Sequence, residues 1–110
     1  MGTAPPDIKG LQEALAATCR QAGVHPLKVI LFGSRARGDA WEHSDWDVLV
    51  VAPEFRDIPF PNRDVLLRRY VRWRRVDLFC YTPEEFDTLS QQIGLVQTAV
   101  TEGMDITPTS

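Results

Sequence analysis

The stretch GSRARGDAWEHSDWDVLVV, residues 33–51, decides how this chain is interpreted. It places Asp45 and Asp47 one residue apart, where the sequence turns apolar, after a Gly33-Ser34 pair and two arginines. Because successive side chains of a strand point to opposite faces, Asp45 and Asp47 are predicted to project together, with Trp46 on the other side. Two carboxylates at the start of an otherwise apolar strand need a cation, a proton or arginines beside them.

A third carboxylate interrupts another apolar run. Asp77 lies within RVDLFCY, residues 75–81, where an aspartate is costly unless a partner satisfies it. If this strand lies beside the strand over 46–52, Asp77 reaches the first two acids. Three carboxylates about 5 Å apart would repel by roughly 3 kcal/mol per pair at an effective dielectric of ~20. A divalent ion with oxygen ligands, Mg²⁺ above all, is the simplest way to relieve that repulsion.

The Gly-Ser pair indicates an anion site beside these acids. Gly33 directly follows the apolar strand predicted over 27–32, and a turn there brings backbone N–H groups forward. Glycine lets a phosphate approach the backbone, the Ser34 hydroxyl can donate to it, and Arg35 and Arg37 add positive charge. Phosphate binding beside a carboxylate-held metal is typical of phosphoryl or nucleotidyl transfer, in which two metals assist the attacking and leaving oxygens.

Structural alternatives stay open for each of these residues. Asp45 and Asp47 suit a turn at a strand edge, since aspartate favours turns. Asp77 can pair with Arg75 or Arg37, and Arg37 can neutralise the acids instead of contacting phosphate.

Hydrophobic periodicity and turn residues predict a small α/β domain. We expect one domain over 1–110, with a core over about 7–103, loose termini and a three- or four-stranded mixed sheet packed with helices. The expected elements, in order, are a helix over 8–22, a strand over 27–32, a loop or short helix over 36–44, a strand over 46–52, a connection over 53–62, a helix over 62–73, a strand over 75–81, an amphipathic helical stripe over 83–103 with Gly94 as a possible break, and a tail or short strand over 104–110.

Composition narrows the function classes. The formal net charge is −3, so the overall field does not favour nucleic acid. The chain has two cysteines, Cys19 and Cys80, whose spacing argues against a disulfide scaffold or a zinc site and favours packing. With no signal peptide and no apolar run of ~20 residues, the chain is predicted to be cytoplasmic, without a membrane partner.

Six arginines form a basic run in and just after the helix predicted over 62–73. A solvated helix face is the default interpretation of such a run. A patch for RNA or for an acidic partner is the minority alternative. The six arginines are Arg63, Arg68, Arg69, Arg72, Arg74 and Arg75.

The sequence resembles the nucleotidyltransferases of the DNA-polymerase-beta superfamily. It is most similar to their smallest members, the minimal nucleotidyltransferase (MNT) domain family. That pattern is a strand, then Gly-Ser, an Ala-Arg-Gly step, Ser-Asp-x-Asp at the next strand, and an acid on a later strand. Here FGSRARGDAWEHSDWDVLVV and RRVDLFCYTPEEF match it, and the resemblance covers roughly residues 10–103. It implies a polymerase-beta-like palm fold.

The resemblance also implies the chemistry. Mg²⁺, as two ions of which the second arrives with the nucleotide, would serve transfer of a nucleoside monophosphate from a nucleoside triphosphate, ATP above all, to an acceptor hydroxyl on a protein or RNA. Asp77 would also help to deprotonate the acceptor. By position, the catalytic and metal-binding residues would be Asp45, Asp47 and Asp77, and the nucleotide-binding residues would be Gly33, Ser34, Arg35 and Arg37.

Partners and one departure follow from the same resemblance. Members this small often pair with a HEPN-type protein as the antitoxin of a toxin–antitoxin couple. A non-catalytic module that neutralises such a partner by occlusion is the alternative function, and a homo-oligomer stays open. The residue between the paired acids is usually aliphatic in the family, whereas here it is Trp46, whose size could shift the acids.

Overall fold

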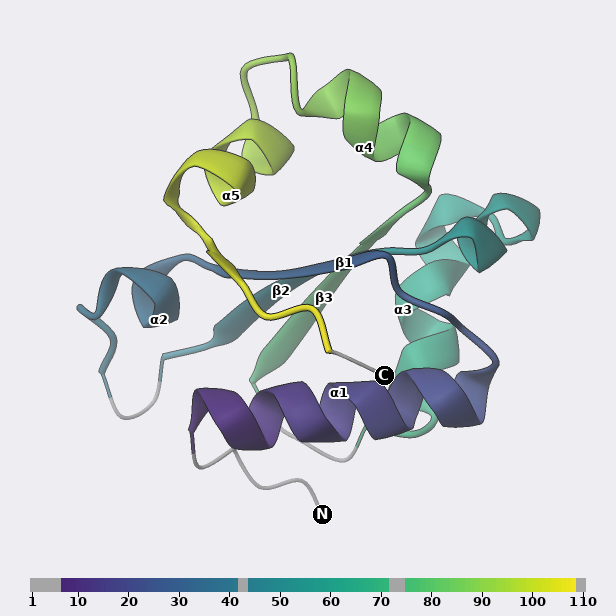
Figure 1. The fold of residues 1–110 in the computed structure, drawn as a ribbon, viewed down its shortest axis with the longest axis horizontal. Helices are drawn as coiled ribbons and strands as arrows, with labels where there is room; N and C mark the ends of the chain where they lie inside the picture. The colour runs from purple at the N-terminus through teal and green to yellow at the C-terminus, as the bar shows by residue number, and fades with distance from the viewer. Residues whose placement is uncertain (1–6, 42–43, 72–74, 109–110) are drawn as a thin grey trace.

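The computed structural model describes residues 7–41, 44–71 and 75–108, which form a four-stranded sheet with helices on both faces (Figure 1). This confirms the predicted α/β class and mixed sheet. The elements are α1 (Ile8–Ala22), β1 (Lys28–Phe32), α2 (Ser34–Arg37), β2 (Trp46–Val51), the 3-10 helix η1 (Pro53–Asp57), α3 (Phe60–Arg68), β3 (Val76–Tyr81), α4 (Pro83–Leu89), α5 (Leu95–Glu102) and β4 (Met104–Asp105).

The strand order is β3-β2-β1-β4. β1 pairs antiparallel with β2 and with β4, whereas β2 pairs parallel with β3. The two-residue β4 means that the C-terminal segment adds a short edge strand to the sheet and is not only a tail. The parallel pair places the starts of β2 and β3 at the same end of the sheet, which is where the predicted acids lie.

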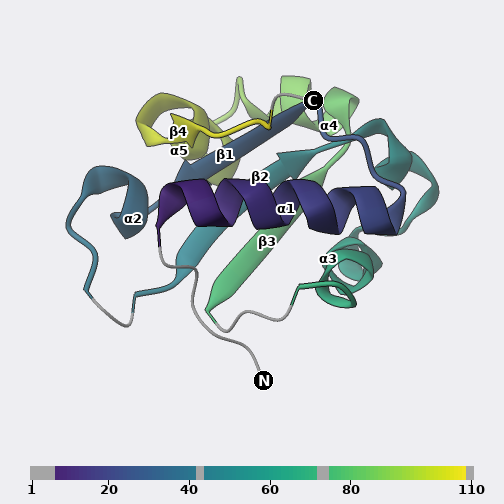
Figure 2. The same ribbon diagram turned by 60° about the horizontal axis from the view of Figure 1, so that its bottom comes forward.

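The two faces of the sheet carry separate apolar clusters. α1 crosses one face in front of β1, β2 and β3, as Figure 2 shows, while α4 and α5 lie on the other face. Alternation along β2 sends Val48 and Val50 into the α1 cluster and Leu49 and Val51 into the α5 cluster. The second face is therefore the one onto which Asp47 projects.

Local signals fix the helix ends that the sequence predicted. The Asp7 carboxylate accepts a hydrogen bond from the Gly10 N–H at 2.7 Å and caps α1, and Gly23 ends the helix with a left-handed φ of 74°. Thr82 and Glu85 form a capping box at the start of α4. These interactions confirm the predicted helix over 8–22 and the start of the helical stripe predicted from residue 83.

The helix predicted over 62–73 is shifted. α3 begins at Phe60 and ends at Arg68, because Pro61 is well suited to the first turn of a helix and Pro59 precedes it. Tyr70, which the predicted helix would have included, lies after α3 and is 40% exposed. Residues 72–74, including Trp73 and two arginines of the basic run, lie outside the described residues.

The predicted solvated arginine face is wrong at Arg63, whose side chain is buried. Its guanidinium donates to the carbonyl oxygens of Ile58 and Cys80 and forms an ion pair with Glu85, at 2.5 Å from Nη1 to Oε1. The same carboxylate accepts from the Thr82 N–H. This network joins α3 to the end of β3 and the start of α4.

The helical stripe predicted over 83–103 is split. Gly94 separates α4 from α5, as the possible break predicted there, and Ile93 beside it is 98% exposed, so it does not continue the amphipathic stripe predicted over 83–103. Within α5, Val96 is buried whereas Val100 is 47% exposed. The break lets α5 turn and cover the β1 side of the sheet independently of α4.

Both cysteines are packing residues, as expected. Cys19 and Cys80 are buried, and burial raises the pKa of the Cys19 thiol to about 11 and that of Cys80 to about 12. Neither is therefore a reactive thiolate at neutral pH. In the part of the chain that the structure describes, no helix has the length and apolar character of a membrane span.

Candidate active site

Two of the three predicted acids are direct neighbours in the sheet. Asp47 and Asp77 are register partners in the parallel pairing of β2 with β3. Neighbouring strands run about 4.8 Å apart, so the two side chains leave the same face side by side. The prediction that β3 lies beside β2 and brings Asp77 to the paired acids is confirmed for this pair.

Gly33 supplies space for Asp47. The end of β1 lies opposite the start of β2, since Phe32 pairs with Asp47. Gly33 has φ 76° and ψ −157°, a conformation open essentially only to glycine. A Cβ at this position would stand 2.5 Å from Asp47 Oδ2. The sequence predicted Gly33 as a phosphate-binding residue, but this close approach to a carboxylate could not be read from the sequence.

Electrostatics couple the acids. The pKa of the Asp47 carboxyl is raised above its ordinary value of 3.8, first by burial and then by the negative charges of Asp77 and Asp45, while Arg37 lowers it. The charges of both other carboxylates therefore repel the Asp47 carboxylate, and a cation nearby would relieve this repulsion.

Asp45 and Asp77 each face an arginine. Arg75 Nη1 lies 3.9 Å from Asp45 Oδ1, and Arg68 Nη2 lies 3.8 Å from Asp77 Oδ1. The structural alternative for Asp77 therefore involves Arg68, a residue that sequence reasoning had not paired with it.

Across residues 7–41, 44–71 and 75–108, no three acidic, histidine or cysteine side chains stand close enough together to enclose a metal ion.

The Gly-Ser turn leads directly into a helix, as expected, although that helix is a single turn that starts at Ser34 instead of after Arg35. The Gly33 carbonyl accepts from the N–H groups of Ala36 and Arg37. Arg37 Nε pairs with the Asp39 carboxylate at 3.3 Å in an exposed position. This Arg37 side chain lies close enough to affect the pKa of Asp47 and is open to solvent.

Arg35 has a different environment. Its guanidinium lies over the Trp46 ring, 4.5 Å from the centroid, and donates to the Ser44 carbonyl oxygen at 2.8 and 3.2 Å. Trp46 is buried against the α1 cluster, so the predicted inward direction of its side chain is confirmed. Its Nε1 is buried without a hydrogen-bond partner. Arg35 and Trp46 together fix the segment that leads into the paired acids.

The family model that describes the nucleotidyltransferase domain matches residues 11–102 of this sequence. The chain belongs to the nucleotidyltransferase domain family. It is also similar to the crystal structure of a "putative nucleotidyltransferase" from Sulfolobus solfataricus, with a TM-score of 0.59 and 28% identity over 74% of this chain and 71% of that chain. No functionally curated protein matches the sequence.

Membership agrees with the residues that suggested it. The matched range includes Gly33, Ser34 and all three acids, and the structural neighbour supports a nucleotidyltransferase fold for this small mixed sheet. Trp46, the departure from the family pattern, keeps its place in the ladder opposite Val76. Its bulk is accommodated on the α1 face, away from the face that carries Asp47.

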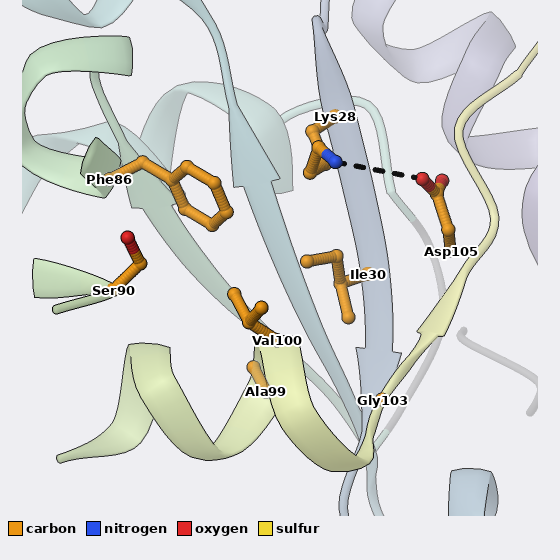
Figure 3. Close-up of a pocket in the computed structure, with 8 residues that line it drawn as sticks. All are labelled: Lys28, Ile30, Phe86, Ser90, Ala99, Val100, Gly103 and Asp105. Atoms are coloured by element: carbon orange, nitrogen blue, oxygen red, sulfur yellow. Dashed lines mark ion pairs between the residues drawn. The ribbon is translucent and has the colours of Figure 1, made fainter. Parts of the chain in front are cut away.

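A separate cavity of about 200 Å³ lies between β1, α4 and α5, on the face of the sheet that also carries Asp47 (Figure 3). Lys28 and Asp105 face each other at its rim, 3.8 Å apart, and Phe86 and Val100 supply apolar lining. None of the predicted site residues lines this cavity. It is therefore distinct from the acid pair at the start of β2 and β3.

Proposed function

We propose that this domain is a magnesium-dependent nucleotidyltransferase. It moves a nucleoside monophosphate from a nucleoside triphosphate, ATP above all, to a hydroxyl group of a protein or RNA. The observation that carries the proposal is the register pairing of Asp47 with Asp77 beside the Gly33 bend, in a chain of the nucleotidyltransferase domain family. In the reaction the acceptor oxygen bonds to the α-phosphorus, and the bond from that phosphorus to pyrophosphate breaks.

The donor set suits the metal. Carboxylate oxygens are the ligands that Mg²⁺ prefers, and the pKa of Asp47 is raised first by burial and then by the neighbouring negative charges, which a cation would neutralise. Asp45, Asp47 and Asp77 are proposed to hold the ion or ions together with the phosphate oxygens of the nucleotide, since the described carboxylates do not stand close enough to enclose a metal by themselves. When bound, magnesium would supply charge neutralisation at the phosphates and a more acidic acceptor hydroxyl.

The remaining roles belong to residues around the acids. Asp77 is proposed to accept the proton of the acceptor hydroxyl, because its side chain is half exposed beside Asp47. Gly33 and Ser34 are proposed to bind the triphosphate through the turn and the hydroxyl. Arg37, exposed and close to the acids, is proposed to contact phosphate, whereas Arg35 is proposed to act through its support of the Trp46 segment.

The direct test uses the purified protein with Mg²⁺ and each nucleoside triphosphate in turn, with and without proteins and RNA from the host. Intact-mass measurement would detect an acceptor heavier by one nucleoside monophosphate and would identify donor and acceptor together. Finding no transfer with any donor, in the presence of the full set of host acceptors, would contradict the proposal.

A second candidate is a non-catalytic binding module that neutralises a HEPN-type partner by occlusion. Exposed apolar side chains around α5, at Ile93 and Val100, favour it. Val100→Asp tests this surface, because Val100 is exposed whereas Val96 is core. Thr98→Asp on the same helix is the matched control. Selective loss of partner binding in Val100→Asp, with nucleotide transfer unchanged, would support the module; equal binding by both variants would contradict it.

A further inference from the structure

Two arginines occupy places beside the acids that the proposed reaction does not use. Arg68 comes from the end of α3 and pairs with Asp77, and Arg75 immediately precedes β3 and pairs with Asp45. Each arginine therefore forms an ion pair with one of the two carboxylates on either side of Asp47. Neither pairing follows from the sequence pattern, since Arg68 is nine residues before Asp77 and Arg75 is thirty residues after Asp45.

Hydrogen bonds to the backbone anchor both arginines at the start of the β2–β3 pair, Arg68 through its guanidinium and Arg75 through its main chain. Arg68 Nη2 donates to the Val76 carbonyl oxygen at 2.7 Å, and Arg68 Nε lies 3.5 Å from the Asp64 carboxylate one helical turn earlier. The carbonyl of Arg75 accepts from the Trp46 N–H at 2.7 Å. The Arg68 guanidinium is thus held at the start of β3 independently of Asp77, and the Arg75 backbone is held beside the start of β2.

Arg75 also has a strained backbone. Its φ is 62°, and it is the only residue other than glycine with a positive φ among the described residues. Such a conformation costs of order 1 kcal/mol for a side chain of this kind and persists where the surroundings impose it. The Arg75 backbone in this conformation accepts the hydrogen bond from the Trp46 N–H, and the Arg75 guanidinium lies 3.9 Å from Asp45.

The ion pairs themselves are weak. Their N–O distances of 3.8 and 3.9 Å are longer than a charge-assisted hydrogen bond, and the four side chains are between 39% and 53% exposed. Exposed pairs of this kind are held by a small net free energy, so a competing ion can displace them. A divalent cation is such a competitor, because it brings twice the charge of one guanidinium.

We propose that Arg68 and Arg75 are counter-ions built into the acid site, which neutralise Asp77 and Asp45 before a metal binds and which divalent metal must displace. The proposal rests on the proposed function, since it concerns the same acids. Its consequence is that metal without nucleotide binds weakly. A guanidinium released from its aspartate can then pair with phosphate, which suits its planar set of donors.

The test measures Mn²⁺ binding without nucleotide, by the loss of the free-ion signal in electron paramagnetic resonance. Arg68→Gln and Arg75→Asn each remove one counter-ion, and asparagine tolerates the positive φ of Arg75. Arg69→Gln is the matched control, because Arg69 is an exposed neighbour on the same helix end. Arg68→Gln and Arg75→Asn should each tighten Mn²⁺ binding roughly 3- to 10-fold, and Arg69→Gln less than about twofold.

The outcomes separate this proposal from the proposed function. Asp47→Asn reports whether the measured Mn²⁺ occupies the acid site. If wild type and Asp47→Asn bind Mn²⁺ equally, the metal site itself is wrong, and the counter-ion proposal falls with it. If binding depends on Asp47 but Arg68→Gln and Arg75→Asn bind no tighter than Arg69→Gln, only the counter-ion proposal is overturned. Arg75→Asn alone decides if Arg68→Gln does not fold.

Discussion

Asp47 and Asp77 are direct partners in the parallel ladder of β2 and β3, and the neighbouring end of β1 bends away at Gly33 just where Asp47 needs room. The three strands therefore build one local surface of two adjacent carboxylates and a glycine turn. The chemistry proposed for this nucleotidyltransferase domain depends on that surface more than on any single residue.

Gly33 is expected to be intolerant of a side chain. Gly33→Ala combines a backbone conformation almost restricted to glycine with a Cβ placed 2.5 Å from Asp47 Oδ2. We expect a loss of roughly 2–4 kcal/mol in the free energy of unfolding and loss of nucleotide transfer. Gly38→Ala is the control, since Gly38 has φ 83° but open space around it and should cost only about 1 kcal/mol. Equal losses in urea unfolding would show that contact with Asp47 is unimportant.

Asp47 is expected to lower stability at neutral pH when no metal is present. Its pKa is raised in the folded state, so folding favours the protonated form, and its contribution becomes unfavourable as pH rises above the ordinary value of 3.8. Asp47→Asn in a metal chelator should therefore raise the melting temperature by about 1–3 °C at about pH 7 and leave it unchanged at about pH 3.

The matched control for this measurement is Asp87→Asn, which removes the same charge from an exposed position on α4. It should not reproduce the gain at neutral pH. A wild type that is more stable than Asp47→Asn at neutral pH, with chelator present, would contradict the repulsion described here.

Arg35 is expected to be a structural residue, and Arg37 is expected to be a ligand-binding residue. Arg35→Gln removes the guanidinium from Trp46 and from the Ser44 carbonyl, and should cost about 1 kcal/mol of stability. Arg37→Gln should leave stability within about 0.5 kcal/mol, because its ion pair is exposed, but should weaken nucleotide binding. Thermal unfolding and nucleotide titration of both variants make the comparison. The reverse pattern would reassign the two residues.

Arg63 is expected to be the arginine whose loss damages the fold most. Arg63→Met would leave the Glu85 carboxylate without its guanidinium and two carbonyl oxygens without a donor, at a cost of roughly 2–4 kcal/mol. Arg56→Met is the control, since Arg56 pairs with Glu84 on the surface and its loss should hardly change the urea midpoint. Similar midpoints for both variants would show that burial of the Arg63 pair is unimportant.

These contrasts show where sequence reasoning succeeded and where it stopped. Strand alternation placed Asp47 and Trp46 on opposite faces, and hydrophobic periodicity with turn residues placed the ends of α1 and the start of α4, because those signals are local. The basic run could not be resolved in the same way. The burial of Arg63 depends on an ion pair with Glu85, which lies 22 residues later and is brought to it only by folding. In the same way, Arg68 reaches Asp77 only once α3 packs beside β3.

The most direct measurement is the initial rate of label transfer from an α-phosphate-labelled nucleoside triphosphate with Mg²⁺, for wild type, Asp47→Asn, Asp77→Asn and the surface control Asp87→Asn. The account predicts that each of the first two substitutions lowers the rate at least ~100-fold while the folded fraction is unchanged, and that the control keeps the wild-type rate. Transfer by Asp47→Asn or Asp77→Asn at the wild-type rate would contradict the claim that this carboxylate pair is the catalytic centre.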